Sequence, residues 1–135
     1  MNKVQDMDFF INITIYGEQF SPQQLLSTIS LPLENCIEKG DIVFIKEHKK
    51  EYNNGSAEIK IEKGSVEEKI NQFNEVLDLL VANREIIREM GGSTISIWVV
   101  ILRSLQGNWE TTSEQIKKIA QIGSSLSITY YQSEQ

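Results

Sequence analysis

The fold is decided by residues 16–41, which read YGEQFSPQQLLSTISLPLENCIEKGD. The stretch contains the end of one strand, a complete short helix and the start of the next strand. Ser21 is placed to be the helix N-cap, Pro22 to be its first residue, and Gln24 to complete a capping box. A Gly40-Asp41 turn then leads into the following strand. This single stretch therefore predicts a β-α-β unit.

A similar order recurs in residues 107–130, which read GNWETTSEQIKKIAQIGSSLSITY. Thr112 and Gln115 have the spacing of a second capping box, and Gly123 ends the predicted helix. The final strand is expected over residues 126–131.

Strands and one long helix are predicted between these two stretches. Alternating apolar and polar residues indicate strands over 8–16 and 57–62, and apolar runs indicate strands over 41–47 and 94–102. Asn53-Asn54-Gly55 favours a tight turn with positive φ, so the strands at 41–47 and 57–62 are expected to form an antiparallel hairpin.

The long helix is predicted to begin at a capping box formed by Ser65 and Glu68. Apolar residues then follow helical spacing, and Asn83 is a place where the helix can break before a last turn. Gly91-Gly92 ends it. Its apolar face consists of Val66, Ile70, Phe73, Leu77, Leu80 and Val81.

The predicted order is β-α-β-β-α-β-α-β, within one α+β domain over residues 1–135. The first six elements match a ferredoxin-like βαββαβ core, to which a helix and a strand are appended. The helices are expected to pack on one face of a mostly antiparallel sheet.

Composition limits the classes of function. Thirteen basic and nineteen acidic residues give a formal charge of −6, which argues against binding to nucleic acid or to an anionic membrane surface. The longest apolar run, residues 97–102, is far shorter than the roughly 18 residues that suggest a membrane span. The N-terminus lacks the pattern of a signal peptide and Cys36 is the single cysteine, so a reducing cytoplasm is expected.

Groups that carry chemistry are scarce. His48 is the single histidine and is expected in a solvated loop, and Cys36 has no second cysteine for a redox pair. No pattern of a metal, cofactor or phosphate site is present, so the chain is predicted not to be an enzyme. A pair of catalytic carboxylates formed only in space stays open as an alternative.

Two features are candidates for binding a partner. One side of the long helix, away from its apolar stripe, is either a solvated face or an acidic docking surface for a basic protein; it carries Glu67, Glu68, Asn71, Glu75 and Asp78. Trp109 precedes the last helix, where a tryptophan is either a lid on the edge of the core or an interface anchor.

The residues at both ends of the chain resemble an uncharacterised, mostly bacterial family, the domain of unknown function 4279. The matching features are Gly17, Phe20-Ser21-Pro22, Pro32 and Lys39-Gly40-Asp41, and near the end Thr112-Ser113, Gly123 and Tyr130. Small acidic members of such families look like immunity proteins, which are encoded beside bacterial toxins. The resemblance implies a fold more strongly than it implies a function.

Three hypotheses follow. The first is a non-enzymatic binding module, of the immunity type, that neutralises a basic partner such as a toxin domain. The alternative is a homodimeric domain that binds a small ligand or has a regulatory role, by analogy with other ferredoxin-like sheets. The third is an enzyme of an unrecognised type.

Overall fold

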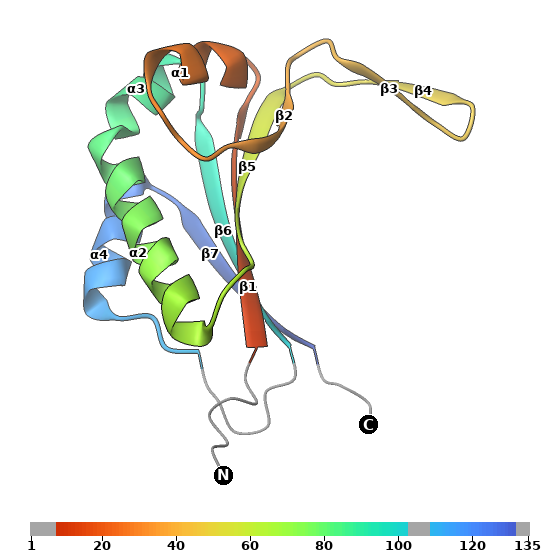
Figure 1. Ribbon diagram of the computed structural model, residues 1–135. Coiled ribbons are helices and arrows are strands. Elements are labelled where there is room, and N and C mark those ends of the chain that lie inside the picture. Colours follow the sequence, from red (N-terminus) through yellow and green to blue (C-terminus); the bar gives the residue numbers. More distant parts are fainter. Residues whose placement is uncertain (1–7, 103–108, 132–135) are drawn as a thin grey trace.

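A computed structural model describes residues 8–102 and 109–131 of the chain (Figure 1). Gly107 and Asn108, which begin the second stretch quoted above, lie outside the described residues. The helices and strands, in chain order, are β1 (Asp8–Gly17), α1 (Pro22–Thr28), β2 (Glu34–Ile37), β3 (Ile42–Ile45), β4 (His48–Glu51), β5 (Gly55–Ile61), α2 (Val66–Ala82), α3 (Arg84–Glu89), β6 (Thr94–Leu102), α4 (Ser113–Ile122) and β7 (Ser125–Tyr131).

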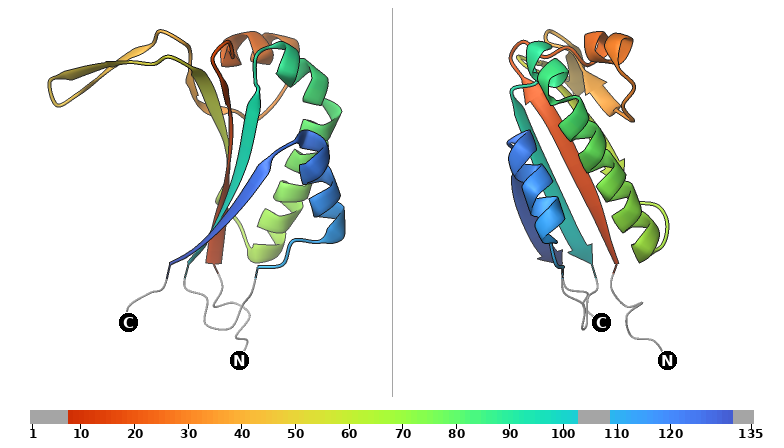
Figure 2. Two further views of the ribbon diagram at one scale, coloured as in Figure 1. Left: turned by 180° about the vertical axis from the view of Figure 1, so that it is seen from behind. Right: turned by 90° about the vertical axis from the view of Figure 1, so that its left-hand side faces the viewer.

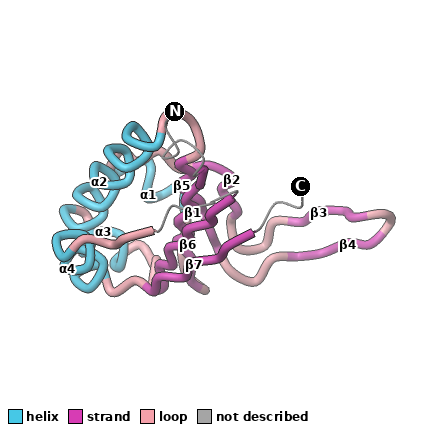
Figure 3. The backbone as a smooth tube through the Cα atoms, turned by 90° about the horizontal axis from the view of Figure 1, so that it is seen from below, coloured by secondary structure: helices cyan, strands magenta, loops and turns pink. Residues whose placement is uncertain are grey.

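Five strands form the main sheet, in the order β2-β5-β1-β6-β7. Every neighbouring pair is antiparallel except β6 and β7, which are parallel. The helices lie on one face of this sheet, as Figure 2 (right) and Figure 3 show. The predicted α+β class, the mostly antiparallel sheet and the one-sided helical layer are therefore confirmed.

The core lies between the sheet and its helical layer. Successive strand residues point to opposite faces, so alternate positions of the three inner strands face the helices. In β1 and β6, for example, Ile13 lies directly opposite Ile97, and both are buried. The main contributors from the strands are Phe9, Ile11, Ile13, Ile15, Ala57, Ile59, Ile61, Ile95, Ile97, Val99 and Ile101, and those from α2 and α4 are Phe73, Leu77, Leu80, Ile119 and Ile122.

The two capping boxes predicted for the longer helices are confirmed. At α2, the Ser65 hydroxyl accepts the backbone N–H of Glu68, and the Glu68 carboxylate accepts the backbone N–H of Ser65. Thr112 and Gln115 make the same reciprocal pair at α4. The possible break at Asn83 is also confirmed, because α2 ends at Ala82 and α3 begins one residue after Asn83.

The short helix α1 is capped in part by a distant residue. Ser21 accepts the N–H of Gln24, as predicted, over 3.2 Å. The Glu38 carboxylate accepts from the Ser21 hydroxyl over 2.7 Å and from the Gln23 N–H over 2.9 Å. Within the described residues, the capping box predicted for the Gln24 side chain is absent, and Glu38 takes its place.

The predicted hairpin between residues 41–47 and 57–62 is wrong. β3 pairs instead with β4, from Ile42 opposite Glu51 to Ile45 opposite His48, and these two strands form a separate small sheet. The turn between them consists of Lys46 and Glu47, whose φ values of 49° and 71° are those of a tight primed turn. Asn and Gly favour such a turn far more strongly than Lys and Glu, which explains why the sequence pattern indicated residues 53–55 instead.

The place next to β5 is taken by β2, a strand that the sequence pattern did not reveal. β2 pairs with β5 at Glu34 opposite Glu58 and at Ile37 opposite Ser56, with an irregular register between them. Asn35, at this irregularity, has a φ of 49° and donates from its side-chain amide to the Glu58 carboxylate over 2.7 Å.

We call residues 40–52, which contain β3 and β4, the arm. Two backbone hydrogen bonds close its base, from the N–H of Gly40 to the carbonyl of Tyr52 and from the N–H of Tyr52 to the carbonyl of Asp41. The arm projects from the end of the main sheet, away from the helical layer (Figures 1 and 3).

Candidate functional site

Groups suited to catalysis are not brought together in the described residues. No group of three or more His, Cys, Asp or Glu side chains there is arranged to hold a metal ion. His48 is exposed on β4. Desolvation raises the pKa of the Cys36 thiol above its ordinary value of 9.0, and the nearby Glu38 carboxylate raises it further. The Cys36 thiol is therefore protonated at neutral pH, which does not suit a nucleophile.

Within residues 8–102 and 109–131, no helix has both the length and the apolar character needed to cross a bilayer.

The acidic side of α2 presents three exposed carboxylates, those of Glu67, Glu68 and Glu75. Glu68 is held in place by its bond to the N–H of Ser65, which is 2.7 Å long. None of the three carboxylates forms an ion pair with another described residue. We call these three residues the acidic patch.

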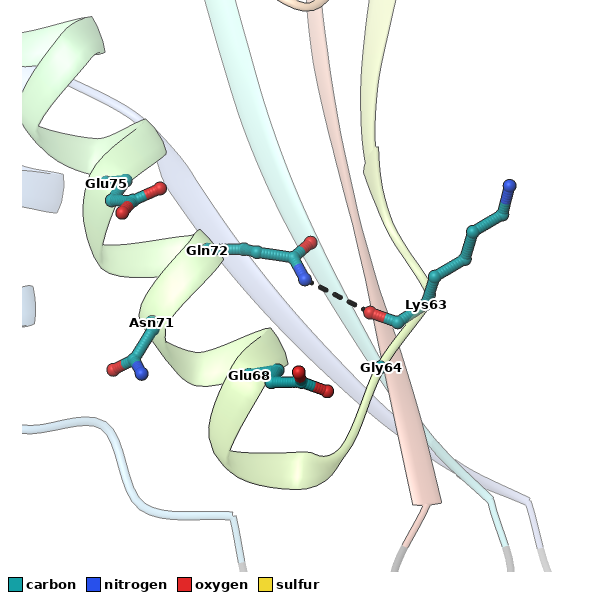
Figure 4. Close-up of a pocket in the computed structure, with 6 residues that line it drawn as sticks. All are labelled: Lys63, Gly64, Glu68, Asn71, Gln72 and Glu75. Carbon is teal, nitrogen blue, oxygen red and sulfur yellow. Dashed lines mark hydrogen bonds between the residues drawn. The ribbon is translucent and has the colours of Figure 1, made fainter.

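A shallow depression of about 350 Å³ lies beside the acidic patch. The Gln72 amide donates to the Lys63 carbonyl over 3.1 Å and so connects α2 to the loop that precedes it. Figure 4 shows that the Lys63 side chain points away from α2, so its ammonium group does not neutralise the patch. The residues that line the depression are Lys63, Gly64, Glu68, Asn71, Gln72 and Glu75.

The fourth predicted acid, Asp78, forms an ion pair and does not line the depression. Its carboxylate lies 2.6 Å from the ammonium group of Lys118, which belongs to α4. Asp78 therefore helps to hold the two helices together, and its negative charge is compensated. The structure brings Glu68 and Glu75 together at the depression, whereas Asp78 lies outside its lining and pairs with Lys118.

The one basic residue of α2 is withdrawn from the surface. Lys69 is 3% exposed, and its ammonium group lies 2.9 Å from the Asp8 carboxylate, contacts the Phe9 carbonyl and stands over the Phe9 ring. Because Lys69 is buried, every exposed charged side chain of α2 is acidic. Burial of Lys69 thus strengthens the negative potential of this helix.

Trp109 is half-buried against the core. Its ring meets Phe9 edge-on at a centroid distance of 5.2 Å and lies 6.3 Å from the Phe73 ring. The indole N–H donates to the Thr111 hydroxyl over 2.9 Å. This is the geometry of a lid on the edge of the core. A role for Trp109 in binding a partner stays a prediction.

The face of the main sheet opposite the helices is the second notable surface, and we call it the open face. Tyr16, Trp98 and Tyr131 are its exposed aromatic residues. Trp98 donates from its indole N–H to the Thr129 hydroxyl over 2.8 Å, and its ring meets the Phe10 ring edge-on at 6.3 Å. No helix of the described residues covers this face (Figure 2).

The arm carries three exposed apolar side chains, two of which are the most exposed large apolar side chains of the described residues. Phe44 is 73% exposed, Ile45 is 58% exposed and Ile42 is 47% exposed. Within residues 42–51, every side chain except that of Val43 is exposed. The sequence pattern had suggested a strand of the main sheet here. The sequence of β4 contains four charged or ionisable residues in a row. This composition was a signal that β4 and its partner β3 do not pack on the core.

Asn71 was predicted on the same side as the acidic residues, whereas Gln72 was missed as a candidate site residue. Both lie three or four positions from Glu68 or Glu75, so they share the same side of α2. Helical spacing alone was enough to identify them.

Comparisons with known proteins give one match. No curated protein and no solved structure matches the chain. The sequence profile of one family matches residues 7–133, which is nearly the whole chain. The chain therefore belongs to the family described as Domain of unknown function (DUF4279).

Proposed function

We propose that the protein is a non-enzymatic binding module that recognises a basic protein through the acidic patch on α2. The observation that carries the proposal is the set of three carboxylates, of Glu67, Glu68 and Glu75, which have no compensating cation among the described residues. They lie beside a depression that is lined mainly by polar and charged residues.

The depression suits a long cationic side chain of the partner. Glu68 and Glu75 supply carboxylate acceptors, and Asn71 and Gln72 supply amide oxygens. A guanidinium group makes its strongest hydrogen bonds to carboxylates, often two at once. The negative charge of the patch also accelerates the encounter with a basic partner by long-range attraction.

A partner of this kind is a toxin domain whose active surface binds phosphates, and the chain then acts as its immunity protein. Small size and a charge of −6 support this assignment. The acidic patch covers the cationic groups with which such a toxin holds its substrate, so binding alone is sufficient for inhibition.

The test begins with the tagged chain purified from its native host. The expected companion is one basic protein in stoichiometric amount, encoded by the adjacent gene. Calorimetry then measures the affinity of that protein for the wild-type chain and for the double variant Glu67→Lys/Glu75→Lys. We expect the variant to bind at least about tenfold more weakly, because two attractive charges become repulsive.

Two further variants sharpen the test. Glu68→Gln removes a charge and keeps the capping box, since Gln also serves at this position. Glu18→Lys/Glu89→Lys makes the same change in net charge at exposed positions outside α2. If the control weakens binding as much as Glu67→Lys/Glu75→Lys does, net charge and not the patch is responsible. If the chain purifies alone, the proposal loses its support.

A homodimeric domain with a ligand-binding or regulatory role is the second candidate. The observation that favours it is the open face, whose aromatic side chains and exposed arm are features of a surface that receives a partner. A small molecule that raises the unfolding temperature of the purified chain would identify this function.

We also propose that the sheet is built on a ferredoxin-like core. In support, β1, α1, β2, β5, α2 and β6 follow one another in βαββαβ order, and their strands have the spatial order β6-β1-β5-β2. The arm is then an insertion, and α4 with β7 is an addition at the edge. A crystal structure that superposes these six elements on known ferredoxin-like domains is the test.

A further inference from the structure

The arm is a hairpin that packs on nothing else in the described chain. Every side chain of β4 is exposed, and in β3 only Val43 is half-buried. An isolated two-stranded hairpin is marginally stable in water, and it gains stability by packing against another surface. Exposure of Phe44 and Ile45 also has a cost in water, which a partner surface would remove.

The distal part of the arm is the basic part of an acidic chain. Residues 42–50 contain Lys46, Lys49 and Lys50 against Glu47, a formal charge of +2 with His48 neutral, whereas Asp41 and Glu51 at the base bring residues 40–52 as a whole to zero. Because the whole chain carries −6, the remainder carries −8. The surface that complements this distal part is therefore acidic, and a second copy of the chain carries a net negative charge.

The β6–β7 part of the open face accepts an apolar arm without burying unpaired charge. Its positions on β6 and β7 are hydroxyl or apolar residues, in pairs such as Ser96 with Ser125 and Trp98 with Ser127. The charged residues at the other edge of this face are Glu34 on β2, opposite Glu58 on β5, and Lys60, whose ammonium group lies 3.9 Å from the Glu58 carboxylate. Two chains that repel each other through their net charge of −6 can therefore meet at the uncharged β6–β7 part of the face.

The dimensions of the arm and of the sheet agree. Six residue steps from Gly40 to the turn at Lys46 give a reach of about 20 Å at the usual rise of a strand. Four gaps between the five strands of the main sheet give a width of about 19 Å. The arm also leaves the sheet on the side of the open face (Figure 3), so it can extend toward a second copy that faces it.

We propose that two copies of the chain form a two-fold dimer in which the arm of each packs on the open face of the other. Phe44 and Ile45 supply the apolar contact with the aromatic side chains of that face. Lys46, Lys49 and Lys50 add long-range attraction to the net negative charge of the partner copy. The interface is isologous, as is usual in symmetric dimers.

The first experiment measures mass by light scattering and sedimentation over a range of concentrations. We expect twice the chain mass of 15.4 kDa at high concentration. The double variant Phe44→Ser/Ile45→Ser should raise the dissociation constant at least about tenfold by loss of apolar contact. Ile116→Ser is the matched control, because Ile116 is 55% exposed on α4, in the helical layer, and its replacement should leave the constant unchanged.

The second experiment locates the contact by mixed disulfide formation in a Cys36→Ser background. One chain carries Lys49→Cys, which lies opposite Phe44 in the hairpin, and the other carries Ser127→Cys on the open face. We expect this pair to cross-link at least about tenfold faster than Lys49→Cys paired with Gln121→Cys, an exposed position on α4. Circular dichroism verifies that each variant is folded.

Three results would overturn the proposal. One is a wild-type chain that stays monomeric at about 0.5 mM, where a dimer of micromolar affinity is nearly complete. The others are a dimer unaffected by Phe44→Ser/Ile45→Ser, and cross-linking that does not prefer the open face. None of these results bears on the acidic patch, because the arm variants leave Glu67, Glu68 and Glu75 unchanged.

Discussion

At the scale of single residues, close backbone approach explains Gly55 better than turn formation does. A Cβ atom on Gly55 would lie 1.8 Å from the Phe20 carbonyl oxygen, so the two backbone segments have room only for glycine. The sequence showed an Asn-Gly turn signal at this point, because a contact with a residue 35 positions earlier leaves no trace in the local pattern.

Gly55→Ala is therefore expected to lower the free energy of unfolding by about 2–3 kcal/mol, since either the backbone at Phe20 or strand β5 must shift to make room for the methyl group. Urea denaturation measures the change. Gly123→Ala is the control. Gly123 has a φ of 79°, but no atom lies within 4 Å of the position that a Cβ would take, so this substitution should lower the free energy of unfolding by only about 1 kcal/mol. Equal effects of the two substitutions would show that the close approach to Phe20 does not matter.

Cys36 gives a prediction about pH. Its pKa is raised in the folded state, first by desolvation and then by Glu38, so the unfolded chain loses this proton at a lower pH than the folded chain does. Above the ordinary value of 9.0 the folded state binds more protons at this residue, and its contribution to stability falls as pH rises.

Alkylation of Cys36 with iodoacetamide tests this shift. We expect the rate in the native protein to reach its midpoint above pH 9.0, and the rate in urea to reach it at the ordinary value. Coinciding pH profiles in the two states would contradict the prediction.

At the scale of elements, the helix ends were predicted well because capping is a local interaction. Ser65 with Glu68 and Thr112 with Gln115 are each three residues apart, so the sequence contains both partners of each box. Glu38, which caps α1 from 17 residues away, was not predicted, because its contact depends on how the chain returns to the sheet.

Ser65→Ala and Thr112→Ala should each lower stability by about 1 kcal/mol through loss of the N-cap. Thermal unfolding followed by circular dichroism measures both variants. Ser113→Ala serves as the control, since Ser113 is exposed at the first position of α4 and is not the cap. A loss of stability in the control equal to that of Thr112→Ala would rule out capping as the cause.

Strands were also predicted correctly where the local pattern was sufficient, and incorrectly where the pairing depends on the rest of the fold. Alternation predicted β1 and β5, and apolar runs predicted β6, because each has a face on the core. Periodicity does not distinguish a strand that enters the sheet from one that leaves it, and so β3 was assigned to the sheet in place of the polar strand β2. The acidic patch follows from helical spacing, whereas the pairing of Asp78 with Lys118 depends on the packing of α2 on α4.

At the scale of the whole molecule, the helical layer and the main sheet are expected to be stable without the arm. Replacing residues 42–51 with Asn-Gly joins Asp41 to Tyr52 through a tight turn, which suits these two residues because they are already hydrogen-bonded. Since the arm contributes no residue to the core, the free energy of unfolding should change by no more than about 0.5 kcal/mol.

Urea denaturation at low protein concentration, where a dimer is dissociated, measures this change. The shortened chain should also be monomeric under conditions in which the wild-type chain dimerises. A large loss of stability in the monomer would mean that the arm supports the sheet from which it projects.

The closed base of the arm also has a consequence for how such a molecule diversifies. Because Asp41 and Tyr52 are joined across the base, the segment between them can be exchanged as a cassette, in length and in sequence, while the remaining strands keep their register. Selection for a new binding partner can then change about ten surface residues while each intermediate sequence still folds. The same junction is a suitable place to graft a recognition loop onto this scaffold.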